Sequence, residues 1–274
     1  MLMHQRKPDT FQLAVEVTEA FASAGIVVSA EEWLLEKLGE RGSALFTDVP
    51  PAQCDAIIAV GGDGTLLRAN ALAMQLDLPL LGINIGRVGF LTEVELDQLS
   101  HACELLANDT YQIEERMMLE AIIDGHLSLA LNDVVVSRGG YSRLIGMDAR
   151  VNGELAGHYV ADGLIVSTPT GSTGYSLSAG GPLVCPEVEC MLLTPICAHS
   201  LQHRPIVTSA GQTITIQLTE ERDAMISIDG QEPFVFHGGH TLTITRACRN
   251  ARFIRLEPCS FFSKIRVKLT EWSC

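Results

Sequence analysis

Hydrophobic positions in the first hundred residues follow two spacings that alternate along the chain. In some segments apolar side chains recur every three or four residues, as on one face of a helix, and in others they form short continuous runs. Such runs are typical of strands that a parallel sheet buries on both faces. The predicted helices are residues 9–24, 31–40 and 65–75, and the predicted strands are residues 26–29, 55–60 and 78–84. This alternation predicts an open α/β sheet with helices on both faces.

The pattern changes near residue 110, where short β-rich runs separated by Gly and Asn turns replace the helical spacing. An Asp124-Gly125 dipeptide predicts a tight hairpin there. We therefore expect an N-terminal open α/β (Rossmann-like) domain over residues 1–114 and a C-terminal β-rich domain over residues 115–250. For residues 251–274, which mix apolar and basic side chains, the sequence leaves open whether the chain returns to the first domain.

The start of the chain departs from the usual order of an open α/β domain, which begins with a strand. Only two or three apolar residues precede the first predicted helix. We therefore expect the first strand to be very short or truncated.

Composition restricts the classes of partner. The formal net charge of −14 over 274 residues argues against a general nucleic-acid binder, which needs a basic face. It does not exclude an anionic ligand, because backbone N–H groups and a metal ion can hold phosphates. The eight cysteines have no common zinc-binding spacing, no charged-then-apolar leader opens the chain, and no apolar run reaches about 18 residues. These features predict a cytoplasmic protein without a membrane span.

The five residues Gly-Gly-Asp-Gly-Thr, beginning at Gly61, join a predicted buried strand to a predicted helix. Such a loop lies at the carboxyl edge of the sheet, where open α/β folds bind ligands. Gly61, Gly62 and Gly64 can adopt positive φ and let the main chain approach a phosphate, and the helix start after Thr65 adds N–H groups. A carboxylate beside a phosphate needs a task, so Asp63 is a candidate base or metal ligand. The alternative is a tight turn in which Asp63 caps the helix.

A second glycine-rich stretch, residues 161–182, continues from a predicted strand that ends at Ser167. Its density of hydroxyls and backbone amides favours a polar ligand with many acceptors, and Tyr175 offers an aromatic face to a base. The alternative, a flexible Ser/Gly-rich linker, does not fit a segment flanked by an apolar strand and an Ala-Gly-Gly-Pro stop. The hydroxyl side chains are those of Thr168, Thr170, Ser172, Thr173, Ser176 and Ser178.

Two further carboxylates lie next to turn sequences. Asp133 follows Asn132 at the entry to a β-rich run, and Asp229 precedes a glycine in what has the sequence of a hairpin turn. For Asp229 an ordinary turn is the simpler interpretation, because Asp-Gly is a common hairpin dipeptide. Arg87 and Arg138 are the basic residues closest to the motifs, and a structural ion pair is the simpler role for each.

Taken together, these motifs resemble the NAD kinases. The resemblance covers the chain from about residue 55 to the end. GGDGT alone is shared with diacylglycerol kinases, sphingosine kinases and 6-phosphofructokinases, whereas the segment TPTGSTGYSLSAGGP is specific to NAD kinases. The matching segments are GGDGTLL (61–67), INIGRVGFLTE (83–93), LNDVVVSRG (131–139), DGLIVSTPTGSTGYSLSAGGP (162–182), HSLQHRPIV (199–207) and DGQ (229–231).

The resemblance implies an NAD-kinase fold with NAD bound between the two domains. It implies transfer of the γ-phosphoryl group of ATP to the 2′-hydroxyl of the adenosine ribose of NAD, with Asp63 as the catalytic base. The phosphate loop would be Gly61, Gly62, Gly64 and Thr65. The NAD-binding residues would be Asn132, Asp133, Asp162, Thr173, Gly174, Tyr175 and Ser178.

The resemblance also implies partners. ATP and NAD would be the substrates, a divalent metal, with Mg²⁺ first among candidates, would assist, and the chain would form homotetramers or homodimers. The sequence does not indicate which residues would hold the metal.

Two other functions remain open from the sequence. One is a lipid or sugar kinase that shares GGDGT, and the other is a catalytically silent relative that binds NAD without turnover. The sequence departs from the family pattern at Asp133, where many members have Glu, and at Gly174, where Ala is commoner.

Overall fold

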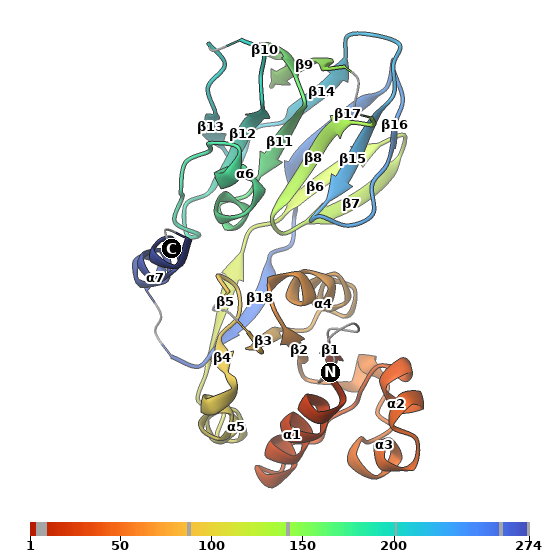
Figure 1. The fold of residues 1–274 in the computed structure, drawn as a ribbon, viewed down its shortest axis with the longest axis vertical. Helices are drawn as coiled ribbons and strands as arrows, with labels where there is room; N and C mark the ends of the chain where they lie inside the picture. The colour runs from red at the N-terminus through yellow and green to blue at the C-terminus, as the bar shows by residue number, and fades with distance from the viewer. Residues whose placement is uncertain (4–9, 87–88, 141–142, 201, 258–259, 273–274) are drawn as a thin grey trace. The chain divides into compact units, whose positions relative to one another are not determined.

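The computed structural model describes residues 1–3, 10–86, 89–140, 143–200, 202–257 and 260–272. The chain forms two compact units (Figure 1). Unit 1 comprises residues 1–115 and 251–274, and unit 2 comprises residues 116–250. Each unit has its own sheets and its own hydrophobic core.

Unit 1 is built on a six-stranded sheet of order β1-β2-β3-β18-β5, with β4 beside β3. Strands β2 and β3 pair in parallel from Ile57↔Leu80 to Gly61↔Asn84, and Phe253 of β18 also aligns in parallel with Leu80. The C-terminal part of the chain therefore supplies a central strand of this sheet. The strands are β1 (Leu2–Met3), β2 (Ile57–Gly61), β3 (Leu80–Asn84), β4 (Val94–Glu95), β5 (Gln112–Arg116) and β18 (Ala251–Arg255).

Helices cover both faces of this sheet, which confirms the prediction from its buried strands. Leu81 and Ile83 of β3 pack in one core with Phe21 of α1 and with α5. Gly82 points the other way, since a Cβ there would lie 2.4 Å from Cδ1 of Leu66 on α4. Thus α4 covers the face opposite to α1 and α5 (Figure 1). The helices are α1 (Thr10–Ser23), α2 (Glu32–Leu38), α3 (Glu40–Leu45), α4 (Asp63–Leu76), α5 (Leu99–Ala107) and α7 (Phe261–Trp272), with 3₁₀ turns η1 (Pro51–Gln53) and η2 (Leu96–Gln98).

The predicted strand at residues 26–29 is wrong, because this segment is irregular. Contacts outside any ladder satisfy two of its carbonyl groups. Val28 O accepts a hydrogen bond from Thr47 N at 2.9 Å, and Ser29 O accepts one from the terminal amino group of Met1 at 2.5 Å. The apolar run therefore reflects burial of Val28 in the core and not strand pairing.

Two other details of the N-terminal part follow from local geometry. The single helix predicted over residues 31–40 divides into α2 and α3 at Gly39, whose φ of 55° interrupts the helix. The first strand is very short, as expected: β1 has two residues, and Leu2 pairs in parallel with Ala59 of β2.

Unit 2 consists of two six-stranded sheets, β10-β9-β14-β17-β6-β7 and β13-β12-β11-β8-β15-β16. One core contains residues of both sheets, among them Met147 and Ile214 of the first and Val134 and Leu164 of the second. Apolar side chains of the two sheets thus bury one another, as in a β-sandwich. The strands are β6 (Leu119–Ile123), β7 (His126–Ala130), β8 (Asp133–Arg138), β9 (Ile145–Val151), β10 (Glu154–Ala161), β11 (Gly163–Ser167), β12 (Cys190–Ile196), β13 (Ile206–Ser209), β14 (Ile214–Leu218), β15 (Ala224–Ile228), β16 (Phe234–Phe236) and β17 (Thr241–Arg246).

Two-residue turns with positive φ at both positions connect β6 to β7 and β9 to β10, and a similar pair of residues begins the loop after β15. The predicted hairpin at Asp124-Gly125 is confirmed: φ is 51° and 78°, and β6 pairs antiparallel with β7. Asp229 has φ of 50° and Gly230 has φ of 67° at the end of β15. Asp, Asn and Gly tolerate this left-handed conformation, which explains the composition of these turns.

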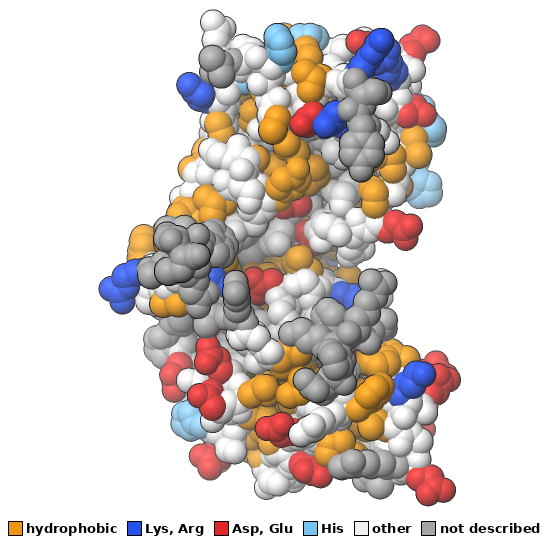
Figure 2. All heavy atoms as spheres, viewed as in Figure 1, with side chains coloured by type: hydrophobic (Ala, Val, Ile, Leu, Met, Phe, Trp, Pro, Cys, Tyr) orange, Lys and Arg blue, Asp and Glu red, His pale blue; other side chains and the backbone are white. Residues whose placement is uncertain are grey.

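Charged side chains are distributed over the surfaces of both units. Among the described residues visible in Figure 2, Lys and Arg side chains are scattered singly or in small groups, and Asp and Glu side chains lie on both units. On the described part of this face, Lys and Arg side chains therefore form no extended basic surface.

Candidate functional site

Asp63 is the first residue of α4 and follows β2 at the carboxyl edge of the unit 1 sheet. Its carboxylate accepts two backbone hydrogen bonds from a turn 27 and 28 residues further along, from Phe90 N to Oδ2 at 3.1 Å and from Leu91 N to Oδ1 at 3.2 Å. The N-cap residue of α4 is Gly62, and no side chain caps this helix. The alternative in which Asp63 serves as a helix cap is therefore wrong.

The glycines around Asp63 matter because they have no side chain, and not because their φ angles are unusual. None of Gly61, Gly62 and Gly64 has positive φ, which corrects that prediction. A Cβ at Gly61 would lie 2.3 Å from Oγ1 of Thr65, whereas Gly62 and Gly64 have no neighbour within 4 Å of that position. The turn is thus packed on its inner side, where Thr65 is buried, and open at Gly62 and Gly64.

Gly89 lets the opposite turn approach Asp63. A Cβ on Gly89 would lie 2.2 Å from Oδ1 of Asp63 and 2.7 Å from Oγ1 of Thr92. Any side chain at this position would displace the turn from the carboxylate. The contact fixes Asp63 at the sheet edge with both oxygens oriented.

In unit 2, Asp229 organises the segment that carries Asn132 and Asp133. Its carboxylate accepts three backbone hydrogen bonds, from Leu131 N to Oδ2 at 2.8 Å, and from Asn132 N and Asp133 N to Oδ1 at 2.7 and 3.1 Å. In return, Asp229 N donates to Asp133 O at 3.0 Å. Asp229 therefore occupies a hairpin turn and also does more than an ordinary turn residue, which the sequence analysis missed. The Asp-Gly pattern shows the turn but not the amides that its side chain binds.

Asp133 and Asp229 form a buried pair of carboxyl groups. Burial raises the pKa of Asp133 to about 7, and the neighbouring charge of Asp229 adds to this rise. Burial also raises the pKa of Asp229, while the hydrogen bonds from the three amides act in the opposite direction. Asp133 therefore keeps its proton to a higher pH than an exposed aspartate does.

Asn132 presents a polar atom with no partner. Its side-chain Oδ1 is buried and accepts no hydrogen bond from any described residue. Gly171 packs directly on the main chain of Asn132, because a Cβ at Gly171 would lie 2.1 Å from Asn132 O. Thr168 N donates to that same carbonyl at 2.9 Å. The second glycine-rich segment therefore packs against Asn132 and is hydrogen-bonded to its carbonyl group.

The hydroxyls of the segment 161–182 divide into two groups. Thr168, Ser172 and Ser176 are fully buried, and the prediction that they serve a ligand is wrong for them. Thr168 Oγ1 donates to Leu131 O at 2.5 Å, Ser172 Oγ donates to Val184 O at 3.3 Å, and Ser176 Oγ bonds Thr194 Oγ1 at 3.0 Å. They hold η3 (Thr170–Thr173) and α6 (Tyr175–Ser178) against the sheet.

The predicted binding residues of this segment are the accessible ones. Tyr175 is 47% exposed and Ser178 is exposed, whereas Thr173 and Gly174 are half-buried. Thr173 Oγ1 donates to Thr170 O at 3.1 Å. A Cβ at Gly174 would lie 4.0 Å from Nδ2 of Asn132. The structure therefore brings Gly174 and Asn132 together on one side of unit 2.

Asp162 lies apart from this group. Asp133 pairs with Ser167 at one end of β11, and Asp162 precedes Gly163 at the other end, five residues or about 16 Å further along the strand. Its carboxylate pairs with Nε of Arg138 at 2.9 Å, the structural ion pair expected for that arginine. Arg87 lies outside the described residues.

Comparison with protein families decides the classification. The model of the ATP-NAD kinase N-terminal domain matches residues 1–111, and that of the ATP-NAD kinase C-terminal domain matches residues 131–256. The chain belongs to the NAD kinase family. The resemblance inferred from the motifs is thereby confirmed.

Curated NAD kinases match along almost the whole chain. The NAD kinase of Desulforamulus reducens is 39% identical over 99% of this chain and 96% of its own length. The NAD kinase of Moorella thermoacetica is 40% identical over 99% of this chain and 88% of its own length. The predicted motifs therefore belong to a family likeness that spans both units.

Solved structures confirm the predicted fold. Yeast NADH kinase complexed with NADH has a TM-score of 0.82 at 24% identity, covering 96% of this chain and 84% of the yeast chain. An NAD kinase from Archaeoglobus fulgidus in complex with ATP has a TM-score of 0.73 at 28% identity, covering 93% and 92%. An α/β unit combined with a β-rich unit is thus the NAD-kinase fold.

Proposed function

We propose that this protein transfers the γ-phosphoryl group of ATP to the 2′-hydroxyl of the adenosine ribose of NAD and forms NADP. The observation that carries the proposal is the match of both NAD kinase domain models to one chain whose GGDGT motif presents an oriented carboxylate. A lipid or sugar kinase is disfavoured, because the likeness extends over the whole β-rich unit.

In this reaction Asp63 acts as the general base. Its carboxylate takes the proton of the 2′-hydroxyl as the ribose oxygen bonds to the γ-phosphorus. The bond between the γ-phosphorus and the β,γ-bridging oxygen breaks, and ADP leaves with that electron pair. The two amide bonds from Phe90 and Leu91 support this role, because they orient both carboxylate oxygens before the substrate arrives.

The glycine-rich turn after β2 binds the phosphate groups. Gly62 and Gly64 are open to close approach, and the first N–H groups of α4 are of the kind that bind anions at a helix start. Gly61 and Thr65 shape the turn from its packed side. This division of tasks explains why three glycines surround one acid.

NAD recognition is assigned to unit 2. The unpartnered Oδ1 of Asn132 supports a hydrogen bond from the ligand, and the exposed ring of Tyr175 supports stacking. Thr173, Gly174 and Ser178 lie in the same segment as Tyr175, and Asp133 and Asp162 complete the proposed set.

We propose that Mg²⁺ binds together with ATP. Among the described residues, no group of three His, Cys, Asp or Glu side chains is arranged to hold a metal ion. Mg²⁺ commonly keeps several waters and binds substrate phosphates with only one or two carboxylates, so these residues fit a metal that arrives with the nucleotide and not a protein-built cage. Such an ion would neutralise phosphate charge, and we assign no step to a protein-held metal.

The proposals for the oligomeric state and the cellular compartment rest on the resemblance to NAD kinases. We propose a homotetramer or homodimer in the cytoplasm. Within the described ranges, no helix combines the length and apolarity needed to span a bilayer.

The direct test combines turnover and binding. Purified protein with NAD, ATP and Mg²⁺ should form NADP, detected with an NADP-specific dehydrogenase. Asp63→Asn should lower turnover by about 10²- to 10⁴-fold, the usual contribution of a general base, while calorimetry still detects NAD binding. NAD binding without turnover by the unaltered protein would instead select the catalytically silent alternative.

A further inference from the structure

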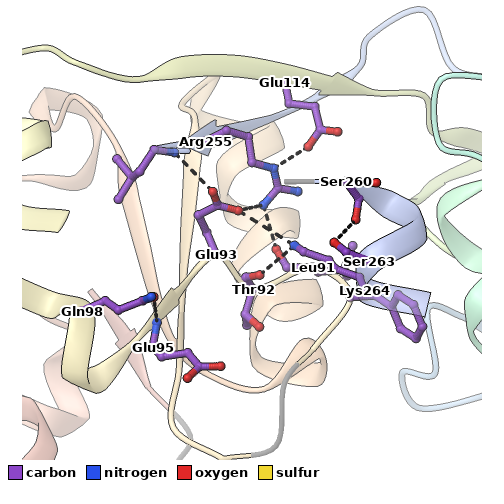
Figure 3. Close-up of polar contacts among 12 residues, drawn as sticks. Leu91, Thr92, Glu93, Glu95, Gln98, Glu114, Arg255, Ser260, Ser263 and Lys264 are labelled. Atoms are coloured by element: carbon purple, nitrogen blue, oxygen red, sulfur yellow. Dashed lines mark hydrogen bonds and ion pairs between the residues drawn. The ribbon is translucent and has the colours of Figure 1, made fainter. Parts of the chain in front are cut away.

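A partly buried cluster of four charged side chains lies next to Leu91 and Thr92 (Figure 3), in the turn whose amides bond to Asp63. Arg255 of β18 donates through Nε to Oε2 of Glu114 at 2.5 Å and through Nη1 to Oε2 of Glu93 at 2.9 Å. Nζ of Lys264 on α7 lies 4.0 Å from the same oxygen of Glu93. We call Arg255, Glu93, Glu114 and Lys264 the Arg255 cluster.

The Arg255 cluster forms hydrogen bonds with the main chain of this turn. Nη1 of Arg255 donates to Leu91 O at 3.2 Å, and Nζ of Lys264 donates to Thr92 O at 3.3 Å. The amide of Leu91 donates to Asp63 from the opposite side of the same residue. Leu91 is therefore bonded to Arg255 through its carbonyl and to Asp63 through its amide.

Three of the four side chains are mostly buried, and Glu114 is 28% exposed. The Arg255 and Glu93 side chains are 12% and 6% exposed, and Lys264 is 16% exposed. Two cations and two anions balance one another, but packed apolar side chains of similar volume often stabilise a protein at least as well. The contribution of the ion pairs is to fix orientation, because the planar guanidinium group of Arg255 holds three acceptors at once, on Glu114, Glu93 and Leu91.

We propose that Arg255 and Glu93, assisted by Lys264, are positioning residues that fix the turn at residues 90–92 and through it the carboxylate of Asp63. The inference rests on the proposed role of Asp63 as base. Loss of the cluster should lower kcat, because a small displacement of a reacting group costs up to about 10²-fold in rate. The KM for NAD should change little, because the proposed NAD contacts lie in unit 2.

The test uses two variants and a matched control. Arg255→Lys keeps the charge but loses the fork, and Glu93→Gln keeps the shape but loses the charge. Arg252→Gln is the control, because Arg252 lies on the same strand and pairs with Asp77 at 3.1 Å, away from the turn. We expect the first two to lower kcat by about 10- to 100-fold with KM within about threefold, and the control to stay within about twofold.

Hydrogen exchange of the intact protein gives a second readout that does not depend on NADP formation. In Arg255→Lys and Glu93→Gln, the amides of Phe90 and Leu91 should exchange at least about tenfold faster than in the unaltered protein, and in Arg252→Gln they should not. A kcat within twofold of the unaltered value in both cluster variants would overturn the proposal. Unchanged exchange at Phe90 and Leu91 would overturn it as well.

The two readouts separate this inference from the function itself. If the unaltered protein makes no NADP, the proposed function fails, while exchange at Phe90 and Leu91 still shows whether the Arg255 cluster holds the turn. If NADP forms but the cluster variants behave like Arg252→Gln, only the positioning role fails.

Discussion

At the scale of single residues, the buried pair of Asp133 and Asp229 is the main electrostatic feature of unit 2. Burial raises the pKa of both acids, but at Asp229 three amide hydrogen bonds act against this rise, whereas at Asp133 the neighbouring Asp229 adds to it. The amide hydrogen bonds therefore favour the ionised form of Asp229, and burial beside Asp229 favours the protonated form of Asp133.

The raised pKa of Asp133 predicts a pH-dependent stability. Between its ordinary value of 3.8 and its folded value of about 7, the folded state binds a proton that the unfolded state has released. The free energy of unfolding should therefore fall as pH rises across this window. Asp133→Asn removes the charge, so it should stabilise the ligand-free protein by about 1–3 kcal/mol at pH 8 and by much less at pH 4. Urea unfolding at both pH values measures this difference, and equal effects would contradict the assignment.

Asp229 should matter for stability through its amide contacts. Asp229→Ala leaves three backbone N–H groups without their acceptor, and we expect a loss of about 3 kcal/mol or more in the free energy of unfolding. Asp124→Ala is the matched control, because Asp124 occupies the same position of an Asp-Gly turn with φ of 51° and its carboxylate pairs with the exposed His240. The control should cost about 1 kcal/mol or less. Similar losses in both variants would show that the turn itself, and not the amide contacts, accounts for the effect.

At the scale of elements, the second glycine-rich segment depends on close packing against Asn132. Gly171→Ala would place a methyl group 2.1 Å from Asn132 O, whereas Gly174→Ala would place one 3.4 Å from Gly171 O, an ordinary contact. We expect Gly171→Ala to abolish NAD binding or to destabilise unit 2 by more than about 2 kcal/mol. Gly174→Ala should leave both nearly unchanged, and it restores the residue commoner in the family.

Calorimetric titration with NAD and thermal unfolding of the two glycine variants check this pair. A Gly171→Ala protein that both binds NAD and unfolds like the unaltered protein would contradict the packing argument. A large loss of NAD affinity in Gly174→Ala would show that the proposed contact between Gly174 and NAD leaves no room for a methyl group.

At the scale of the whole molecule, the sequence predicts the architecture well because hydrophobic spacing is a local property. The α/β unit, the β-rich unit and the Asp124-Gly125 hairpin all follow from it. The strand predicted at residues 26–29 fails because burial of Val28 mimics strand pairing. Local patterns report burial, and they cannot say which backbone groups pair.

The candidate site is predictable only in part for a similar reason. Gly-Gly-Asp-Gly-Thr points to Asp63, but the amides that orient Asp63 come from Phe90 and Leu91, and the carbonyl of Leu91 is in turn bonded to Arg255, 164 residues away. Such contacts depend on the tertiary fold. The same holds for Asp229, which lies 96 to 98 residues from the amides that it binds.

The central claim is that Asp63 removes the ribose proton as phosphate is transferred to NAD. The most direct measurement is the rate of NADP formation by the unaltered protein and by Asp63→Asn, with the NAD affinity of both determined by calorimetry. The account predicts NADP from the unaltered protein, a rate lower by about 10²-fold or more in Asp63→Asn, and NAD affinities that agree within a few-fold. Equal rates in the two proteins would contradict it.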